Sequence, residues 1–195
     1  MTQFSPQFPR NFSIPINIML VGEAPGAEEE KEGKPFIGMS GKLLRKTLLE
    51  IEIEPDDVYI TNTFWQRPPN NDVGFFFARN DGLNKVCLDY PSSGSNQFLK
   101  EDWRNVSPRL QSELDELQPR IILAAGRIPM WALTGQTQIT RYAGNIMDVK
   151  NGLVEYNGKC IPIFHPAYML RNRSLIDKWR EDMRQIFNFI QMERQ

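Results

Sequence analysis

Three polar side chains of different chemical types each follow an apolar segment of this chain: Glu23, Asn62 and His165, the last being the only histidine in the sequence. A carboxylate can accept a proton from water, and a side-chain amide offers both a hydrogen-bond donor and an acceptor. An imidazole can donate a hydrogen bond to negative charge as that charge develops. Brought together, these groups could recognise a small polar ligand and assist the cleavage of a bond in it.

The segments that precede these residues are predicted to be buried strands. Short apolar runs of strand length occur four times, at residues 16–21, 58–61, 121–125 and 161–164. They alternate with segments of helical pattern, at residues 42–51, 100–117, 128–133 and 174–192. This alternation predicts an α/β fold, a three-layer α/β/α sandwich around a central, mainly parallel four-stranded sheet. Because ligands bind outside the carboxyl ends of such strands, we expect Glu23, Asn62 and His165 to surround one pocket.

Three segments lie outside this alternation of strands and helices, and a separate structure is predicted for each. Residues 1–14 are expected to form an irregular arm. Residues 70–96 are rich in Asn, Asp, Gly and Ser, and they are expected to form an inserted loop. A hairpin is predicted over residues 146–161, because Asn157-Gly158 favours a type I′ turn.

Length and composition predict one domain over residues 1–195, with 41% apolar and 24% charged residues. The net charge of −1 argues against binding nucleic acid through bulk charge, although a local basic patch could still hold a few phosphates. No apolar run has the length of a membrane span, and no signal-peptide pattern is present. The chain has two cysteines, Cys87 and Cys160, and this low number argues against a disulfide framework and favours a cytoplasmic protein.

Five motifs follow one another along the chain. They read GEAPGAEEE at 22–30, GKPFIGMSG at 33–41, YITN at 59–62, RPPNN at 67–71 and HPAYMLR at 165–171. In order and spacing, the motifs resemble family 4 of the uracil-DNA glycosylase superfamily, and the similarity covers residues 16–187. The resemblance implies a monofunctional DNA glycosylase, which hydrolyses the N-glycosidic bond of uracil in DNA and leaves an abasic site, as in base excision repair. Such an enzyme must first flip the base out of the helix, because a stacked base is inaccessible.

The resemblance also implies roles for the residues that would surround the base. Phe36 stands where the family stacks the flipped base, and Asn62 where it reads the O4 and N3–H edge of uracil. His165 matches the residue that donates a hydrogen bond to the uracil O2 as the bond breaks. Ala24 is expected to border the base, at a position where the best-known uracil glycosylases hold water with an aspartate.

The acid role must therefore lie elsewhere, and three positions match polar groups around the sugar and the attacking water: Glu23, Glu29 and Asn71. The sequence does not rank them. The resemblance implies DNA contacts for a further set of residues in the loops around the pocket, namely Pro25, Gly38, Ser40, Gly41, Pro68, Pro69, Arg171 and Arg173. The expected partner is DNA, single- or double-stranded, and the protein is expected to act as a monomer.

The chain departs from family 4 in one respect that bears on cofactors. The family usually carries an iron–sulfur cluster held by four cysteines, whereas this chain has two, and Gln66 stands where a cysteine is common. We therefore expect no cluster, no other cofactor and no metal. Two alternatives stay open. One is a glycosylase for another modified pyrimidine, for example in phage DNA as a defence system. The other is a non-catalytic DNA-binding protein of the same fold.

Overall fold

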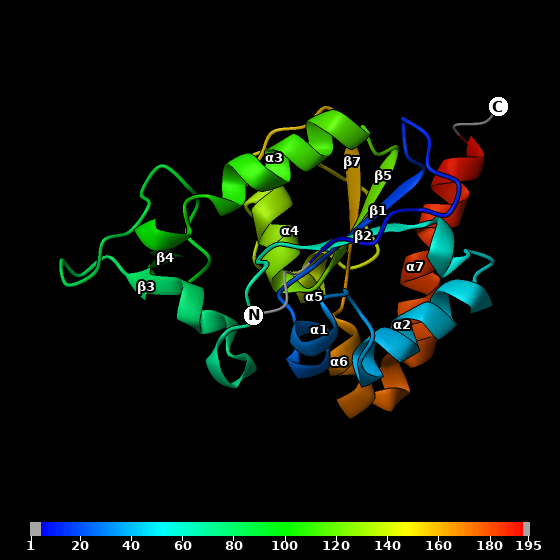
Figure 1. Ribbon diagram of the computed structural model, residues 1–195, viewed down its shortest axis with the longest axis horizontal. Helices are drawn as coiled ribbons and strands as arrows, with labels where there is room; N and C mark the ends of the chain where they lie inside the picture. Colours follow the sequence, from blue (N-terminus) through cyan, green and yellow to red (C-terminus); the bar gives the residue numbers. More distant parts are fainter. Residues whose placement is uncertain (1–4, 193–195) are drawn as a thin grey trace.

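A five-stranded sheet forms the centre of the computed structural model, which describes residues 5–192 (Figure 1). The strand order is β2-β1-β5-β7-β6. Four strands run parallel: β1 (Ile18–Gly22), β2 (Tyr59–Asn62), β5 (Ile121–Ala125) and β7 (Lys159–Ile163). The three-layer α/β/α fold with a mainly parallel sheet is confirmed. The predicted number of four strands is wrong, because β6 (Met147–Asp148) adds a short antiparallel edge strand.

Helices cover both faces of this sheet (Figure 1). Each face has its own hydrophobic core. One core includes side chains of α3 (Val106–Leu117) and α4 (Arg127–Thr134). The other includes side chains of α2 (Met39–Glu50) and α7 (Ile176–Met192). Burial on both faces explains why the strands read as continuous apolar runs rather than as alternating patterns.

Shorter elements connect the layers. Three are α-helical: α1 (Ala27–Glu32), α5 (Ile139–Tyr142) and α6 (Pro166–Arg171). Five are single 3-10 turns, at Pro55–Asp57, Pro69–Asn71, Val73–Phe76, Glu101–Trp103 and Arg173–Leu175. Among the helices within residues 5–192, none is both long enough and apolar enough to cross a membrane.

The predicted hairpin over residues 146–161 is correct in its pairing and wrong in its turn. β6 pairs with β7 in antiparallel register, but residues 149–158 connect the two strands. Neither Asn157 nor Gly158 has the positive φ that a type I′ turn requires. Both strands continue a larger sheet, so the register is set by β5 on the far side of β7 rather than by the turn.

The inserted segment 70–96 is partly ordered into regular structure, against the expectation of an irregular loop. It contains β3 (Phe77–Arg79), which pairs with β4 (Gln97–Leu99) in a second, two-stranded sheet. This sheet projects beyond the main body on the side of α3 (Figure 1). Phe76 is fully buried and stacks on Phe64 with ring centroids 3.7 Å apart, so the insertion shares the core of the domain.

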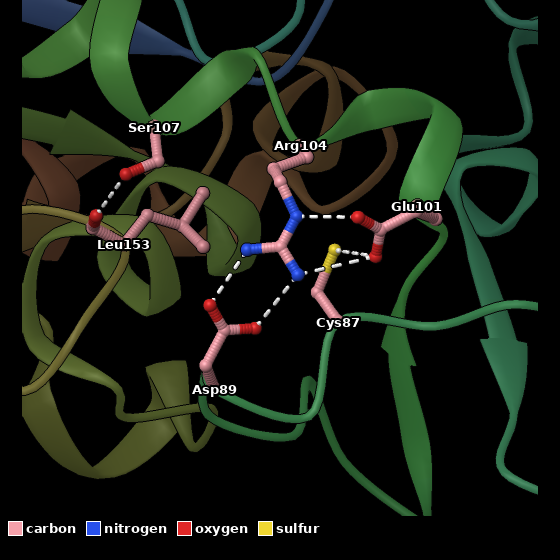
Figure 2. Close-up of polar contacts among 6 residues, drawn as sticks. All are labelled: Cys87, Asp89, Glu101, Arg104, Ser107 and Leu153. Carbon is pink, nitrogen blue, oxygen red and sulfur yellow. Dashed lines mark hydrogen bonds and ion pairs between the residues drawn. The ribbon is translucent and has the colours of Figure 1, made fainter.

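A guanidinium anchors the far end of the insertion (Figure 2). Arg104 donates to both oxygens of Asp89, at 2.6 and 3.0 Å, and also to the carboxylate of Glu101. The thiol of Cys87 donates to the same Glu101 carboxylate, at 3.3 Å. One arginine thus connects two separate parts of the chain with paired, charge-assisted hydrogen bonds.

The described part of the N-terminal arm, residues 5–14, lies against β2. Gln7 forms an isolated antiparallel bridge with Ile60. The ring of Phe8 contacts Tyr59 edge-on, with centroids 5.2 Å apart. The arm is therefore attached to the outer strand of the sheet, although it forms no regular strand.

Candidate active site

A cavity of about 580 Å³ opens at the carboxyl ends of the parallel strands. Eleven of the residues singled out in the sequence line it: Glu23, Ala24, Pro25, Glu29, Phe36, Ser40, Asn62, Pro68, Asn71, His165 and Arg171. They come from the carboxyl end of β2 and from the segments that follow β1, β2 and β7, as expected for an open parallel sheet. The predicted pocket around Glu23, Asn62 and His165 is therefore present.

Gly22, the last residue of β1, lets two of these side chains approach each other. A Cβ atom at this position would lie 2.2 Å from Asn62 Oδ1 and 2.6 Å from Phe36 Cζ. The amide and the ring therefore share the space above a residue that has no side chain. The Phe36 ring also faces His165, with centroids 6.2 Å apart and planes inclined by 36°. A flat apolar wall, an amide and an imidazole thus border one volume.

Asn62 is the last residue of β2 and is only 2% exposed. Its backbone is held from two sides. The next residue, Thr63, donates its N–H to the carbonyl of Gly22 at 2.8 Å. Arg109 of α3 donates to the carbonyls of Asn62 and Thr63, at 2.7 and 2.6 Å. Arg109 is itself paired with Glu113, a carboxyl whose pKa is raised by burial. The backbone that carries the Asn62 amide is therefore fixed by a buried cation.

His165 caps α6 in a way that defines its protonation. Its Nδ1 accepts a hydrogen bond from the Ala167 N–H at 3.2 Å, so Nδ1 carries no proton and the neutral ring has its proton on Nε2. Burial lowers the pKa of His165, and Arg171 lowers it further, while Glu23 opposes the shift. The imidazole is therefore neutral near pH 7 and can donate from Nε2.

Nuclear magnetic resonance can test this state directly, since the chain has one histidine. In a tag-free protein we expect the Nε2–H tautomer at pH 7 and a pKa below the ordinary 6.5. Because the unfolded chain binds this proton more readily, the free energy of unfolding should fall as pH drops from about 6.5 toward the lowered pKa. A pKa at or above 6.5, or a proton on Nδ1, would contradict this assignment.

Glu29 lines the cavity, but one of its carboxylate oxygens is bound by the protein backbone. Its Oε1 accepts hydrogen bonds from the N–H groups of Ile37 and Gly38, at 3.1 and 2.9 Å. The residue is 8% exposed. Two backbone donors on one carboxylate oxygen fix the loop that carries Phe36.

Two glycines at the start of α2, Gly38 and Gly41, were expected to contact DNA. The Gly38 N–H is engaged by Glu29, so it does not offer itself to a phosphate as expected. Gly41 is buried, and a Cβ there would lie 2.1 Å from the carbonyl carbon and oxygen of Phe36. Both glycines lie outside the cavity lining and support Phe36 instead.

Glu23 and Asn71 face the cavity from two different loops. Within residues 5–192, the Glu23 carboxylate accepts no hydrogen bond from the protein, which leaves it available to water. Asn71 has a left-handed backbone, with φ of 57°, and its Oδ1 accepts from Arg67 Nε at 2.8 Å. Arg67 also pairs with Glu30 at 3.2 Å, so this contact ties the proline-rich loop to α1.

Two further residues expected near DNA lie outside the cavity lining, namely Pro69 and Arg173, and both are exposed. The cavity is also lined by six residues that lie outside the five motifs: Val73, Gly126, Arg127, Ile139, Thr140 and Phe164. Arg127 could have been predicted as a lining residue, because it directly follows a buried strand and Gly126. Ile139 and Thr140 belong to a four-residue helix that has no marked pattern.

Known proteins are similar to this chain over most of its length. A sequence profile described as the Uracil DNA glycosylase superfamily matches residues 9–190. The chain belongs to this superfamily. Among its relatives is the Type-4 uracil-DNA glycosylase of Thermotoga maritima, 33% identical over 164 residues, which are 83% of this chain and 70% of that protein. The resemblance stated from the motifs is confirmed.

Two further glycosylases of the same type are similar to this chain. The Type-4 uracil-DNA glycosylase of Archaeoglobus fulgidus is 31% identical over 176 residues, 87% of this chain and 74% of that protein. The one of Sulfurisphaera tokodaii is 34% identical over 178 residues, 87% of this chain and 68% of that protein.

The iron–sulfur cluster implied by family 4 does not fit the residues of this superfamily member. A cluster needs four thiolates, and the chain has two cysteines. Cys87 donates to Glu101 in the insertion, whereas Cys160 lies fully buried in β7, and burial raises the pKa of both thiols to about 12. No group of three or more His, Cys, Asp or Glu side chains within the described residues could hold a metal ion.

Proposed function

We propose that this protein is a monofunctional uracil-DNA glycosylase that hydrolyses the N-glycosidic bond of deoxyuridine and leaves an abasic site. The observation that carries the proposal is the convergence of Phe36, Asn62 and His165 on one cavity, where the Phe36 ring and the Asn62 amide meet above Gly22. The Type-4 relatives support it, since their activity concerns the same base. The natural role of such an enzyme is the first step of base excision repair.

Recognition of the base follows from the two groups that meet at Gly22. The Phe36 ring offers a flat surface for stacking, and base–aromatic stacking contributes roughly 1–3 kcal/mol per base. The Asn62 amide can donate to the uracil O4 and accept from N3–H, a pattern that cytosine reverses. A base extruded from the helix would therefore be selected by both shape and polarity.

Bond cleavage follows from His165 and the polar groups near the sugar. As the bond between C1′ and N1 breaks, its electron pair moves into the uracil ring and negative charge grows on O2. The His165 Nε2–H donates to that oxygen, which stabilises the transition state more than the ground state. Water held by Asn71 and Glu23 then adds to C1′, Glu23 accepts its proton, and the departing uracil anion takes up a proton from solvent. The products are free uracil and an abasic sugar, and neither a metal nor a Schiff base takes part.

We also propose that residues at the rim of the cavity contact the DNA strand. Pro25, Ser40, Pro68 and Arg171 border the cavity and are suited to hold the strand on either side of the flipped nucleotide. The more distant Arg173 adds positive charge beyond the mouth. We also propose that the protein acts as a cytoplasmic monomer on single- or double-stranded DNA.

Substitution of Phe36 by leucine should weaken stacking while keeping an apolar residue in place. We expect the rate of uracil excision to fall about 5- to 150-fold, the equivalent of roughly 1–3 kcal/mol of stacking energy. A matched control is Phe75→Leu, an exposed phenylalanine of the insertion, which should excise at the native rate. Single-turnover kinetics on a uracil oligonucleotide measures both. Equal rates for Phe36→Leu and native protein would exclude Phe36 as the stacking residue.

Product analysis tests the proposed function itself. The purified protein is incubated with DNA that contains one uracil, and chromatography with mass detection follows release of the free base. We expect one uracil and one abasic site per damaged strand, without strand cleavage before alkali. Release of a different modified pyrimidine, with none of uracil, would favour the alternative substrate. Tight binding to uracil-containing DNA without any product would favour the non-catalytic alternative.

A further inference from the structure

Arg45 of α2 turns its guanidinium toward the protein instead of toward solvent. Its Nε donates to the carbonyl of Phe36 at 3.1 Å, and its Nη2 donates to the Gln7 side chain at 2.6 Å. A weaker contact reaches the Pro35 carbonyl at 3.4 Å. Burial lowers the pKa of Arg45, in keeping with an enclosed cation. The fixed fork of donors in arginine allows one guanidinium to bind several oxygens at once.

The residue that receives this contact has an unusual backbone. Phe36 has φ of 51°, a left-handed conformation that is costly for a side chain with a Cβ atom. Such conformations persist only where the surroundings hold them. On one side Gly41 leaves room for the Phe36 carbonyl, since a Cβ there would lie 2.1 Å from it. On the other side Arg45 binds the same carbonyl. The direction of the Phe36 ring depends on this fixed peptide.

Gln7 connects Arg45 to the strand that carries the reading amide. Its backbone exchanges two hydrogen bonds with Ile60, at 2.8 and 2.9 Å. Its side-chain nitrogen donates to the carbonyls of Pro55 and Val58, at 2.8 and 3.1 Å, which directs the side-chain oxygen to Arg45. The chain of contacts therefore runs from β2 through Gln7 and Arg45 to Phe36.

We propose that Arg45, held by Gln7, is a positioning residue that fixes the Phe36 ring relative to Asn62, so that a flipped base can stack on the ring while its polar edge meets the amide. Arg45 acts through the loop and touches neither base nor phosphate. The N-terminal arm thereby belongs to the support of the active site. The inference rests on the proposed function for its catalytic consequence, but its structural part can be tested without activity.

The matched pair of variants is Arg45→Met and Lys46→Met. Each removes one positive charge from α2, and the Lys46 side chain is 72% exposed. We expect Arg45→Met to lower the single-turnover excision rate about tenfold or more, because small displacements of positioned groups are costly. Affinity for DNA and its salt dependence should stay native, since no phosphate contact is lost. Lys46→Met should keep the native excision rate.

A double-substitution cycle separates positioning from general destabilisation. In a Phe36→Ala background the ring is already absent, so adding Arg45→Met should cost less than about twofold. Full loss in that background would overturn the inference, as would a native rate for Arg45→Met alone. Gln7→Ala should reproduce part of the Arg45→Met effect, and a native rate for Gln7→Ala would remove Gln7 from the proposal.

Amide hydrogen exchange decides the structural part even if the native protein fails to excise uracil. Exchange in residues 33–38 should be at least about fivefold faster in Arg45→Met than in native protein, and unchanged in Lys46→Met. Unchanged exchange in Arg45→Met would overturn the positioning role while leaving the glycosylase assignment intact. Faster exchange without any uracil release from native protein would instead refute the proposed function alone.

Discussion

Replacement of His165 by alanine is expected to lower the rate of uracil excision about 10²- to 10³-fold, the usual effect of removing one donor to a developing anion. The reason is geometric. Nδ1 is occupied by the Ala167 N–H, which leaves the Nε2–H as the group that can reach O2 of the base. The DNA affinity should change little, because the lost interaction strengthens only as the glycosidic bond breaks. Single-turnover rates and binding titrations measure the two quantities separately.

A second variant at the same position gives the control. His165→Gln keeps a side-chain N–H donor, so it should recover part of the rate lost in His165→Ala. Thermal unfolding of both variants shows whether loss of the α6 cap affects stability. A native excision rate in His165→Ala would remove this residue from the chemistry.

Substitution of Gly22 by alanine is expected to reduce excision by about 10²-fold or more, although it adds only one methyl group. The new Cβ would lie 2.2 Å from Asn62 Oδ1 and 2.6 and 2.7 Å from two carbons of the Phe36 ring. Both groups must move, and displacement of positioned groups by about 1 Å can cost 10²-fold in rate. The measurement is the single-turnover excision rate on a uracil oligonucleotide.

Gly74→Ala is the matched control for Gly22→Ala. Its Cβ would meet nothing closer than an Asp72 side-chain oxygen at 3.0 Å, outside the cavity. We expect it to keep the native rate. Equal rates for Gly22→Ala and Gly74→Ala would mean that the base does not lie where Phe36 and Asn62 meet, and the site would need a different arrangement.

The pocket could be predicted from sequence because its signals are local. Each of β1, β2 and β7 is a short apolar run, and the residue that follows it reaches the same edge of the sheet. The short strand β6 was expected only as part of a hairpin, and its place at the edge of the main sheet was missed because two residues carry too little pattern to assign them to a sheet. β3 was missed for the same reason, and its partner β4 lies about 20 residues further along the chain.

The supports of the site were not predictable, because they depend on contacts between distant segments. Glu29 looked like a candidate acid, and its bonds to two backbone amides exist only once the Phe36 loop has folded back. Arg45 looked like an ordinary surface cation of a helix, yet it contacts Gln7, 38 residues away. Arg109 similarly reaches the Asn62 carbonyl across 47 residues. No periodicity in the sequence encodes such pairs.

The most direct test of the central claim is base selectivity in one strand. The native protein is given otherwise identical oligonucleotides with uracil, thymine or cytosine at one position, each single-stranded and paired, and abasic sites are then cleaved with alkali. We predict cleavage at uracil alone, with its loss in His165→Ala. No cleavage at uracil by a correctly folded protein, in single- or double-stranded DNA, would contradict the account.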